Sequence, residues 1–400
     1  MSAATAAIRP KPAATGRFRA ELELLLAATS PPAGSARTLR LENCIDQPLD
    51  WDFVLRLADA HGLAPLLFWS TQKFQHAVPT AHLATLRLQY QRNARKNLLL
   101  SHMLVEVQER LQCAGVPSLA WKGPSLAVCA YRDIALREFS DLDLFVPRKQ
   151  IQRAKEILLS SGFRPALQLT AAQERLYLKL DNEFPFHRGP HENILELQWR
   201  LAPHFYAVDF DLERLFERAI VAQIGDVECR TLCPEDLLLT LCVHAAKHGW
   251  GRLNWITDVA WLLGTQNLDW LHVQHEAEAV GIERILLVTL ALTRHFYATS
   301  LPRMAQMQIA DCLEVQRLTL QMADRIIHQR ALDISSPEYF LLMCHVRERW
   351  RDRVRLLRRL AFMPGPGEWT KISLPRALAP FYLVIRAFRL SGKMASLFSR

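Results

Sequence analysis

The sequence lacks a hydrophobic run long enough to cross a membrane. A spanning helix needs about 18 to 20 apolar residues, whereas the run at 286–292 is short and the run at 381–385 is interrupted by Arg386. Residues 1–17 are rich in alanine and proline and contain no continuous apolar core, so we expect no secretory signal. These absences predict a cytoplasmic protein without a transmembrane segment.

The sequence also lacks the cysteine pattern of a disulfide-stapled protein. Its eight cysteines are scattered through 400 residues, mostly within apolar stretches. Disulfide frameworks are typical of small secreted domains that cannot bury a sufficient core. We therefore expect reduced thiols, in agreement with a cytoplasmic location.

The whole chain carries 49 Lys and Arg residues against 40 Asp and Glu residues, a net charge of +9. Most of the chain nevertheless lacks an excess of either charge. Residues 347–400 contain 13 basic and 3 acidic residues, which leaves 36 basic and 37 acidic residues before them. Basic proteins commonly bind nucleic acid or anionic membranes. Such a contact is therefore predicted only for the tail 347–400, which could pack on the body, touch a membrane surface or bind RNA.

The rest of the composition is that of an ordinary globular chain with several regions. Residues 1–35 are rich in Ala, Pro and Ser and predict a disordered lead with at most one short helix. Helical spacing, capped by Asp50, predicts a helical entry region over 36–94. A proline and acids in a first turn open a predicted helical domain at 231–350, before a basic amphipathic tail at 351–400.

The segment 95–230 changes from helical spacing to short strand-like runs. In order, it contains an apolar run at 118–121, a helical stretch at 125–131, a strand at 142–146, a helix at 148–160 and a hairpin over 184–201. This order predicts an α/β core. The fold class is therefore α+β, with a small mixed-sheet core flanked by N-terminal and C-terminal helical regions.

Two carboxylates lie near the start of the strand at 142–146. Asp141 and Asp143 are two residues apart, and on a strand such residues project from one face at a spacing of about 7 Å. They repel each other unless a positive group lies between them. Hard oxygen ligands suit Mg²⁺, which also keeps substrate phosphates as ligands. The pair therefore predicts a site for divalent cations.

A site for two Mg²⁺ ions generally needs a third acid from a neighbouring strand. Glu196 lies between two leucines in the alternating segment 194–199. An isolated carboxylate in such an apolar strand is costly without a partner. We therefore predict Glu196 as the third metal ligand or the general base.

A loop suited to phosphate precedes the carboxylate strand. Lys122 and Gly123 break an apolar run and open a helix at about Ser125. A helix N-terminus presents N–H donors and a positive dipole end to phosphate, and Lys122 or Arg137 could neutralise the remaining charge. A Lys-Gly pair or an Asp-x-Asp pair is a weak signal by itself. Their joint order of strand, loop, helix, Arg and acidic strands is much more specific.

The stretch LAWKGPSLAVCAYRDIALREFSDLDLFVP at 119–147, followed by ILELQWRL at 194–201, resembles the uncharacterised nucleotidyltransferases of the polymerase-beta-like superfamily. That group is often met in bacterial clusters for exopolysaccharide or modified-peptide biosynthesis. The resemblance extends over roughly residues 45–395. It implies a nucleoside triphosphate (NTP) donor, Mg²⁺ at Asp141 and Asp143, and a third carboxylate at Glu196. The Lys-Gly-Pro-Ser loop stands where the superfamily has its phosphate-gripping Gly-Ser loop.

The sequence departs from the superfamily pattern in the loop and at two positions of the segment 194–201. The loop lacks the Gly-Ser pair, Glu196 stands where Asp is common, and Gln198 stands where His is expected. One extra methylene moves a carboxylate by about 1 Å, which can be costly in catalysis. Three functions therefore stay open: a Mg²⁺-dependent nucleotidyltransferase, a catalytically silent nucleotide-binding scaffold, and, because of the basic tail, a toxin-like transferase acting on tRNA.

His244, Lys247 and His248 fall on one face of a predicted helix, with Arg252 one turn further. They could form a basic face that closes over the nucleotide, and His248 is therefore included among the predicted nucleotide-binding residues. They could equally form a buried, hydrogen-bonded His pair at a helix end. Asp258, which lies among apolar residues, is expected to pair with Arg252 or Lys247 between domains.

Overall fold

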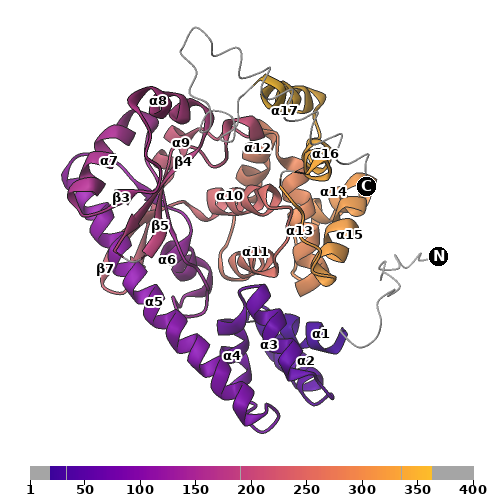
Figure 1. Ribbon diagram of the computed structural model, residues 1–400. Helices are drawn as coiled ribbons and strands as arrows, with labels where there is room; N and C mark the ends of the chain where they lie inside the picture. Colours follow the sequence, from indigo (N-terminus) through magenta and orange to yellow (C-terminus); the bar gives the residue numbers. More distant parts are fainter. Residues whose placement is uncertain (1–18, 33, 190, 335, 363–400) are drawn as a thin grey trace, which may run out of the picture.

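The structure, a computed structural model, describes residues 19–32, 34–189, 191–334 and 336–362 and combines a seven-stranded mixed sheet with many helices (Figure 1). The predicted α+β fold is confirmed. The helices are α1 (Arg19–Thr29), α2 (Gly34–Ile45), α3 (Trp51–Ala60), α4 (Ala64–Thr71), α5 (Thr80–Cys113), α6 (Gly123–Leu126), α7 (Ile151–Ser160), α8 (Ala171–Leu180), α9 (Leu212–Glu217), α10 (Pro234–Lys247), α11 (Leu253–Thr265), α12 (Trp270–Val280), α13 (Glu283–Tyr297), α14 (Arg303–Asp311), α15 (Leu313–Ile327), α16 (Pro337–His345) and α17 (Trp350–Phe362). Shorter turns are the π-helix η1 (Ala127–Tyr131) and the 3₁₀ turns η2 (Arg148–Gln150) and η3 (His204–Tyr206). The strands are β1 (Leu119–Ala120), β2 (Leu142–Phe145), β3 (Arg164–Pro165), β4 (Glu183–Arg188), β5 (His191–Gln198), β6 (Ile220–Ile224) and β7 (Val227–Thr231).

The sheet has the strand order β3-β4-β5-β2-β1-β7-β6, with β2 parallel to β5 near its middle. Alternate residues of β2 enter two different cores, as a strand buried on both faces requires. Leu142 and Leu144 pack with residues of α5 and α7, whereas Phe145 belongs to the core built around α10 and α11. Helix α10 thus lies between one face of the sheet and α13 (Figure 1).

The predicted core elements from β1 to β5 are present in the predicted order, but the helix α8, which was not predicted, lies between α7 and the hairpin of β4 and β5. Asp50 caps α3 as expected, because its carboxylate accepts a hydrogen bond of 2.9 Å from the Phe53 amide. The expected boundary between 94 and 95 falls inside the continuous helix α5. The hairpin of β6 and β7 and the short strand β3 were not predicted.

Helix α1 is the one short helix expected within residues 1–35, and it is an integral part of the fold. Leu24 and Leu25 are fully buried in the largest core. The indole N–H of Trp261 donates a hydrogen bond of 2.8 Å to the Thr29 carbonyl at the end of α1. Residues 1–18 lie outside the described residues.

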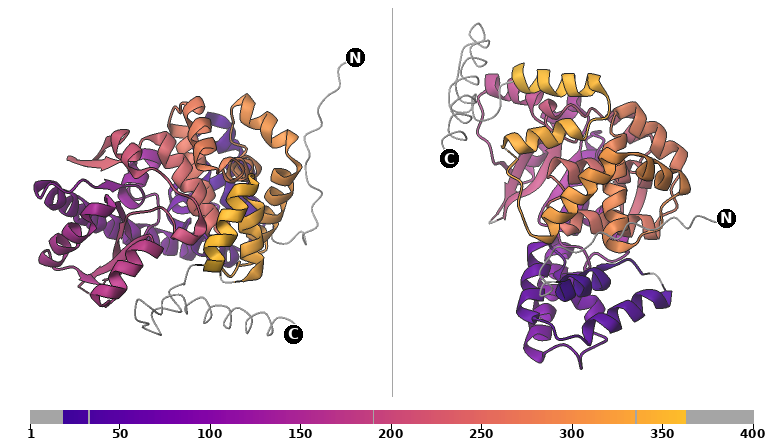
Figure 2. Two further views of the ribbon diagram at one scale, coloured as in Figure 1. Left: turned by 90° about the horizontal axis from the view of Figure 1, so that it is seen from above. Right: turned by 90° about the vertical axis from the view of Figure 1, so that its right-hand side faces the viewer.

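The first part of the basic tail packs on the body of the protein. Arg347 is fully buried and donates a hydrogen bond of 2.7 Å to the Tyr206 carbonyl. On α17, Arg359 contacts both carboxylate oxygens of Asp209 at 3.1 and 2.6 Å. Figure 2 shows α16 and α17 alongside the remaining helices. A membrane or RNA contact of 363–400 falls outside the described residues and stays a prediction.

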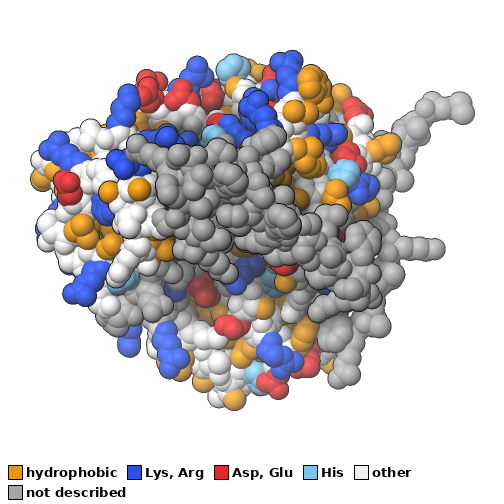
Figure 3. Space-filling view, turned by 45° about the horizontal axis from the view of Figure 1, so that its top comes forward, with side chains coloured by type: hydrophobic (Ala, Val, Ile, Leu, Met, Phe, Trp, Pro, Cys, Tyr) orange, Lys and Arg blue, Asp and Glu red, His pale blue; other side chains and the backbone are white. Residues whose placement is uncertain are grey.

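The described surface agrees with the even charge balance of residues 1–346. Acidic and basic side chains are interspersed on the face shown in Figure 3. All eight cysteines are free thiols, as expected. Among the described helices, none is long and apolar enough to span a membrane.

Candidate active site at the β2–β5 strand pair

Asp143 and Glu196 lie side by side on neighbouring parallel strands. The register of β2 and β5 places Asp143 directly opposite Glu196. The flanking leucines of both strands enter the core of α5 and α7, so the two acids point to the opposite face, toward α10. The predicted proximity of these two carboxylates is therefore present in the structure.

Two further acids surround this pair. Asp141 lies just before β2, and its charge raises the pKa values of both Asp143 and Glu196. Glu183 on β4 is in register with Gln198 on β5, beside Glu196. Glu183 was not among the predicted site residues, although its alternation with the buried Phe184 on β4 indicates that it faces the same side as the other acids.

Lys122 provides a positive charge inside this acidic cluster. Its ammonium group lies 3.0 Å from Oδ1 of Asp143, and the two side chains are 11% and 0% exposed. The same ammonium lies 4.6 Å from the centre of the Trp121 ring, within range of a cation–π interaction. The predicted phosphate-binding lysine is thus held in a buried ion pair with a predicted metal ligand.

The side-chain amide of Gln198 joins the carboxylates. Its nitrogen lies 2.8 Å from Asp143 Oδ1, 3.0 Å from Glu196 Oε2 and 3.3 Å from Glu183 Oε2. The amide oxygen accepts a hydrogen bond of 3.0 Å from the indole N–H of Trp121. Because an indole N–H can only donate, Trp121 fixes the amide with its NH₂ group toward the acids.

The acidic charge of the cluster exceeds the positive charge beside it, and the pKa values reflect this excess. Burial, with the charges of Asp141 and Glu196, raises the pKa of Asp143 to about 7 despite the opposing effect of Lys122. Burial and the neighbouring Glu183 raise the pKa of Glu196 to about 7. Burial lowers the pKa of Lys122, but the surrounding carboxylates outweigh it and the net shift is upward. The arrangement therefore favours the uptake of further positive charge.

The Lys-Gly loop lies directly against the carboxylates. Gly123 has a φ of +58°, and a Cβ at this position would lie 3.1 Å from the Asp141 carbonyl oxygen. Ser125 is fully buried, and its hydroxyl donates a hydrogen bond of 3.0 Å to the Lys122 carbonyl. Ser125 therefore stabilises the loop, and its role as a nucleotide ligand stays a prediction.

Arg137 lies in a buried ion pair between the core and the helical domain. Its guanidinium contacts Asp258 on α11 at 2.8 and 3.0 Å, and Tyr131 donates a further hydrogen bond of 2.7 Å to the same carboxylate. The expected partners of Asp258, Arg252 and Lys247, were wrong, because its partner is Arg137 on the segment between η1 and β2. A phosphate role for Arg137 stays a prediction, supported by one buried guanidinium nitrogen without a hydrogen-bond partner.

The C-terminal end of α10 carries the predicted histidines toward Lys122. The His244 ring lies 5.9 Å from Trp121 and 4.8 Å from His248, both measured between ring centres. Burial, together with the charges of Lys247 and Lys122, lowers the pKa of His248 to about 3. His248 is therefore neutral near pH 7 in the protein without a bound nucleotide, and its role as a nucleotide ligand stays a prediction.

The acidic cluster has donors that suit Mg²⁺, although its geometry is closed. Within the described ranges, no group of three or more Asp, Glu, His or Cys side chains is arranged to hold a metal ion. Lys122 and Gln198 instead contact the carboxylate oxygens. Oδ2 of Asp143 is buried and has no hydrogen-bond partner, and all the acids offer hard oxygen ligands. The oxygen ligands present therefore suit Mg²⁺ by their chemistry, while Lys122 and Gln198 contact them in this arrangement.

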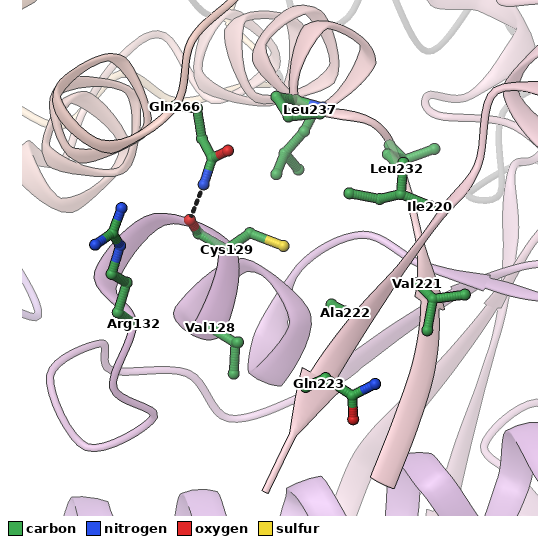
Figure 4. A pocket seen from close by; sticks show the side chains of 11 residues that line it. Val128, Cys129, Arg132, Ile220, Val221, Ala222, Gln223, Leu232, Leu237 and Gln266 are labelled. Carbon is green, nitrogen blue, oxygen red and sulfur yellow. Dashed lines mark hydrogen bonds between the residues drawn. The ribbon is translucent and has the colours of Figure 1, made fainter. Parts of the chain in front are cut away.

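A separate pocket of about 230 Å³ opens between η1, β6 and the start of α10 (Figure 4). Its lining is mostly apolar and includes Val128, Ile220 and Leu237. The Gln266 amide donates a hydrogen bond of 2.6 Å to the Cys129 carbonyl at its edge. No predicted site residue lines this pocket, so it is not the carboxylate site.

Comparison with known proteins places this geometry in a family. A search of curated proteins found no match. The sequence profile of a family described as uncharacterised nucleotidyltransferase matches residues 47–298, which include the acidic cluster, the Lys-Gly loop and α10. The chain therefore belongs to the uncharacterised nucleotidyltransferase family.

Proposed function

We propose that the protein is a Mg²⁺-dependent nucleotidyltransferase that moves a nucleoside monophosphate from an NTP to an acceptor. The observation that carries this proposal is the register of β2 and β5, which sets Asp143 beside Glu196. Asp141 adds a third carboxylate at the same place. Family membership supports the nucleotide donor, and the excess of buried acid supports a divalent cation.

The proposed transfer forms one bond and breaks one. An acceptor oxygen attacks the α-phosphorus, the bond from this phosphorus to the bridging oxygen of the β-phosphate breaks, and pyrophosphate leaves. Glu196, with a pKa of about 7, is suited to take the acceptor's proton near neutral pH. Asp141 and Asp143 would hold Mg²⁺. Bound Mg²⁺ would neutralise charge on the phosphate oxygens and the leaving group.

The loop and the helical domain would hold the donor. Lys122 and the backbone N–H groups at Gly123 lie next to the acids, where the triphosphate has to lie for the transfer. The neutral His248 and the half-buried Lys247 approach from α10, and the charge of Lys247 already acts on Glu196. The eight free thiols support our proposal of a cytoplasmic location.

Calorimetric titration with ATP, GTP, CTP and UTP in MgCl₂ tests the donor site. We expect wild-type protein to bind at least one nucleotide, and Asp141→Ala/Asp143→Ala to lose at least about tenfold in affinity. Asp226→Ala, in the exposed turn between β6 and β7, is the matched control and should bind like wild type. No binding by wild type, or equal binding by the double variant, would refute the assignment.

A catalytically silent nucleotide-binding scaffold is the second candidate. This candidate is favoured by the side-chain amide of Gln198, which donates hydrogen bonds to the carboxylates of both Asp143 and Glu196. Incubation with α-labelled NTPs separates the two functions. Label transferred to a polysaccharide, a peptide or tRNA in a cell extract, and lost in Asp143→Asn, supports the transferase, whereas nucleotide binding without any transfer supports the scaffold.

A further inference from the structure

The ion pair of Lys122 and Asp143 lies at the carboxylate that would hold a divalent cation under the proposed function. Lys122 Nζ and Gln198 Nε2 approach the same oxygen of Asp143, at 3.0 and 2.8 Å. This oxygen therefore already has two donors, while Oδ2 of the same carboxylate has none. A divalent cation held by Asp141 and Asp143 would meet a carboxylate whose charge is already partly neutralised.

We propose that Lys122 is an exchangeable counter-cation: it neutralises Asp143 while the metal site is empty, and it leaves Asp143 when a divalent cation binds. This inference rests on the proposed function. Lys122 is then a positioning residue that links the binding of the metal at Asp143 to the binding of the donor's phosphates at the Gly123 loop. The ammonium released from Asp143 remains beside the Gly123 loop, where it can pair with a phosphate oxygen of the donor.

The surroundings of Lys122 support exchange rather than a purely structural ion pair. A permanently buried ammonium needs acceptors for its three donors, yet among the described residues Lys122 has one carboxylate contact and the face of Trp121. Gln198 is held by Trp121, so it can remain in place when the lysine moves. The Lys122 side chain as a whole is 11% exposed, so the chain that carries the ammonium is not completely enclosed.

The inference predicts that Lys122 competes with metal. Binding of Mn²⁺ alone, without nucleotide, is measured from the electron paramagnetic resonance signal of free Mn²⁺ at pH 8.5. Loss of a charge-assisted contact of about 1.5–3 kcal/mol corresponds to a gain of at least about tenfold in affinity. We therefore expect Lys122→Met to bind Mn²⁺ at least about tenfold more tightly than wild type.

Lys155→Met is the matched control. Lys155 on α7 forms a comparable, partly buried ion pair with Glu174 on α8 at 2.7 Å, and neither residue belongs to the acidic cluster, so its loss should leave Mn²⁺ affinity unchanged. Equal affinity of wild type and Lys122→Met, with binding abolished by Asp143→Asn, would overturn the inference and leave the proposed function intact. Binding unaffected by Asp143→Asn in either background would refute the metal site itself.

A second measurement uses wild-type protein, in case Lys122→Met does not fold. Brief reductive methylation followed by peptide mass spectrometry reports how accessible each lysine amine is. We expect saturating Mg²⁺ to speed methylation of Lys122 several-fold and to leave Lys155 unchanged. An unchanged or slower rate at Lys122, with Mg²⁺ shown to bind, would overturn the exchange.

Discussion

Asp143 makes the stability of the protein depend on pH in an unusual direction. The unfolded carboxyl loses its proton near pH 4, whereas the pKa in the folded protein is raised to about 7. Between these values the folded state binds more protons than the unfolded state. The contribution of Asp143 to the free energy of unfolding therefore falls as pH rises from about 4 to about 7.

Asp143→Asn should remove this pH dependence. Relative to wild type, its free energy of unfolding should rise between pH 5 and pH 8 by on the order of 1 kcal/mol, measured by urea denaturation in EDTA. Glu314→Gln is the control, because a hydrogen bond from Arg317 lowers the pKa of Glu314 to about 2 and its effect should be the same at both pH values. A constant offset for Asp143→Asn would contradict the prediction.

The sequence was sufficient to predict the acids on one strand but not the groups that contact them. Asp141, Asp143 and Glu196 stand out because carboxylates interrupt apolar, strand-like segments. Glu183 acquires its place only through the register of β4 on β5, and Trp121 through its hydrogen bond to a residue 77 positions away. The alternation with Phe184 gives the face on which Glu183 lies, but no local signal gives its neighbour on β5 or the partner of Trp121. The same holds for the Lys122–Asp143 pair, which brings a predicted phosphate ligand onto a predicted metal ligand.

At the scale of elements, the loop between β1 and α6 depends on glycine. Gly123 combines a φ of +58° with a Cβ position 3.1 Å from the Asp141 carbonyl, while Gly115 has a φ of +70° and open space. Substitution of either glycine by alanine should lower the free energy of unfolding by about 1 kcal/mol, because alanine disfavours a positive φ. Gly123→Ala should cost more and should also weaken nucleotide binding, as measured by thermal unfolding and calorimetry. Equal losses of stability for Gly123→Ala and Gly115→Ala would show that the close approach of Gly123 to the Asp141 carbonyl does not contribute.

Regular periodicity determined which elements could be predicted. The helices and the strands β2, β4 and β5 show clear apolar spacing. The β6–β7 hairpin was missed, although Gly225 and Asp226 form a turn between β-branched segments. Its exposed apolar residues, such as Val221, blur the alternation, because an edge strand is covered on one face only.

At the scale of the whole molecule, the core and the helical domain are joined by the Arg137–Asp258 pair. Removing one partner leaves the other charge buried, so Asp258→Ala should destabilise the protein by about 3–5 kcal/mol. The double variant Arg137→Met/Asp258→Leu should lose less than the sum of the single variants. Urea denaturation measures all three. Arg317→Met, which breaks an exposed ion pair with Glu314, is the control and should lower the free energy of unfolding by less than about 1 kcal/mol. If the losses of the Arg137 and Asp258 variants add up in the double variant, the two residues are not coupled and the prediction is contradicted.

The burial of α1 and Arg347 sets the minimal folding unit of this protein. The family match ends at 298 and begins at 47, yet Trp261 donates to Thr29 and the Tyr206 carbonyl accepts from Arg347. A fragment cut to the matched residues would expose the apolar surface covered by Leu24 and Leu25 and leave these buried groups unsatisfied. Any truncation, fusion or domain exchange therefore has to retain both flanks, because the stretch that identifies the family is smaller than the stretch that folds.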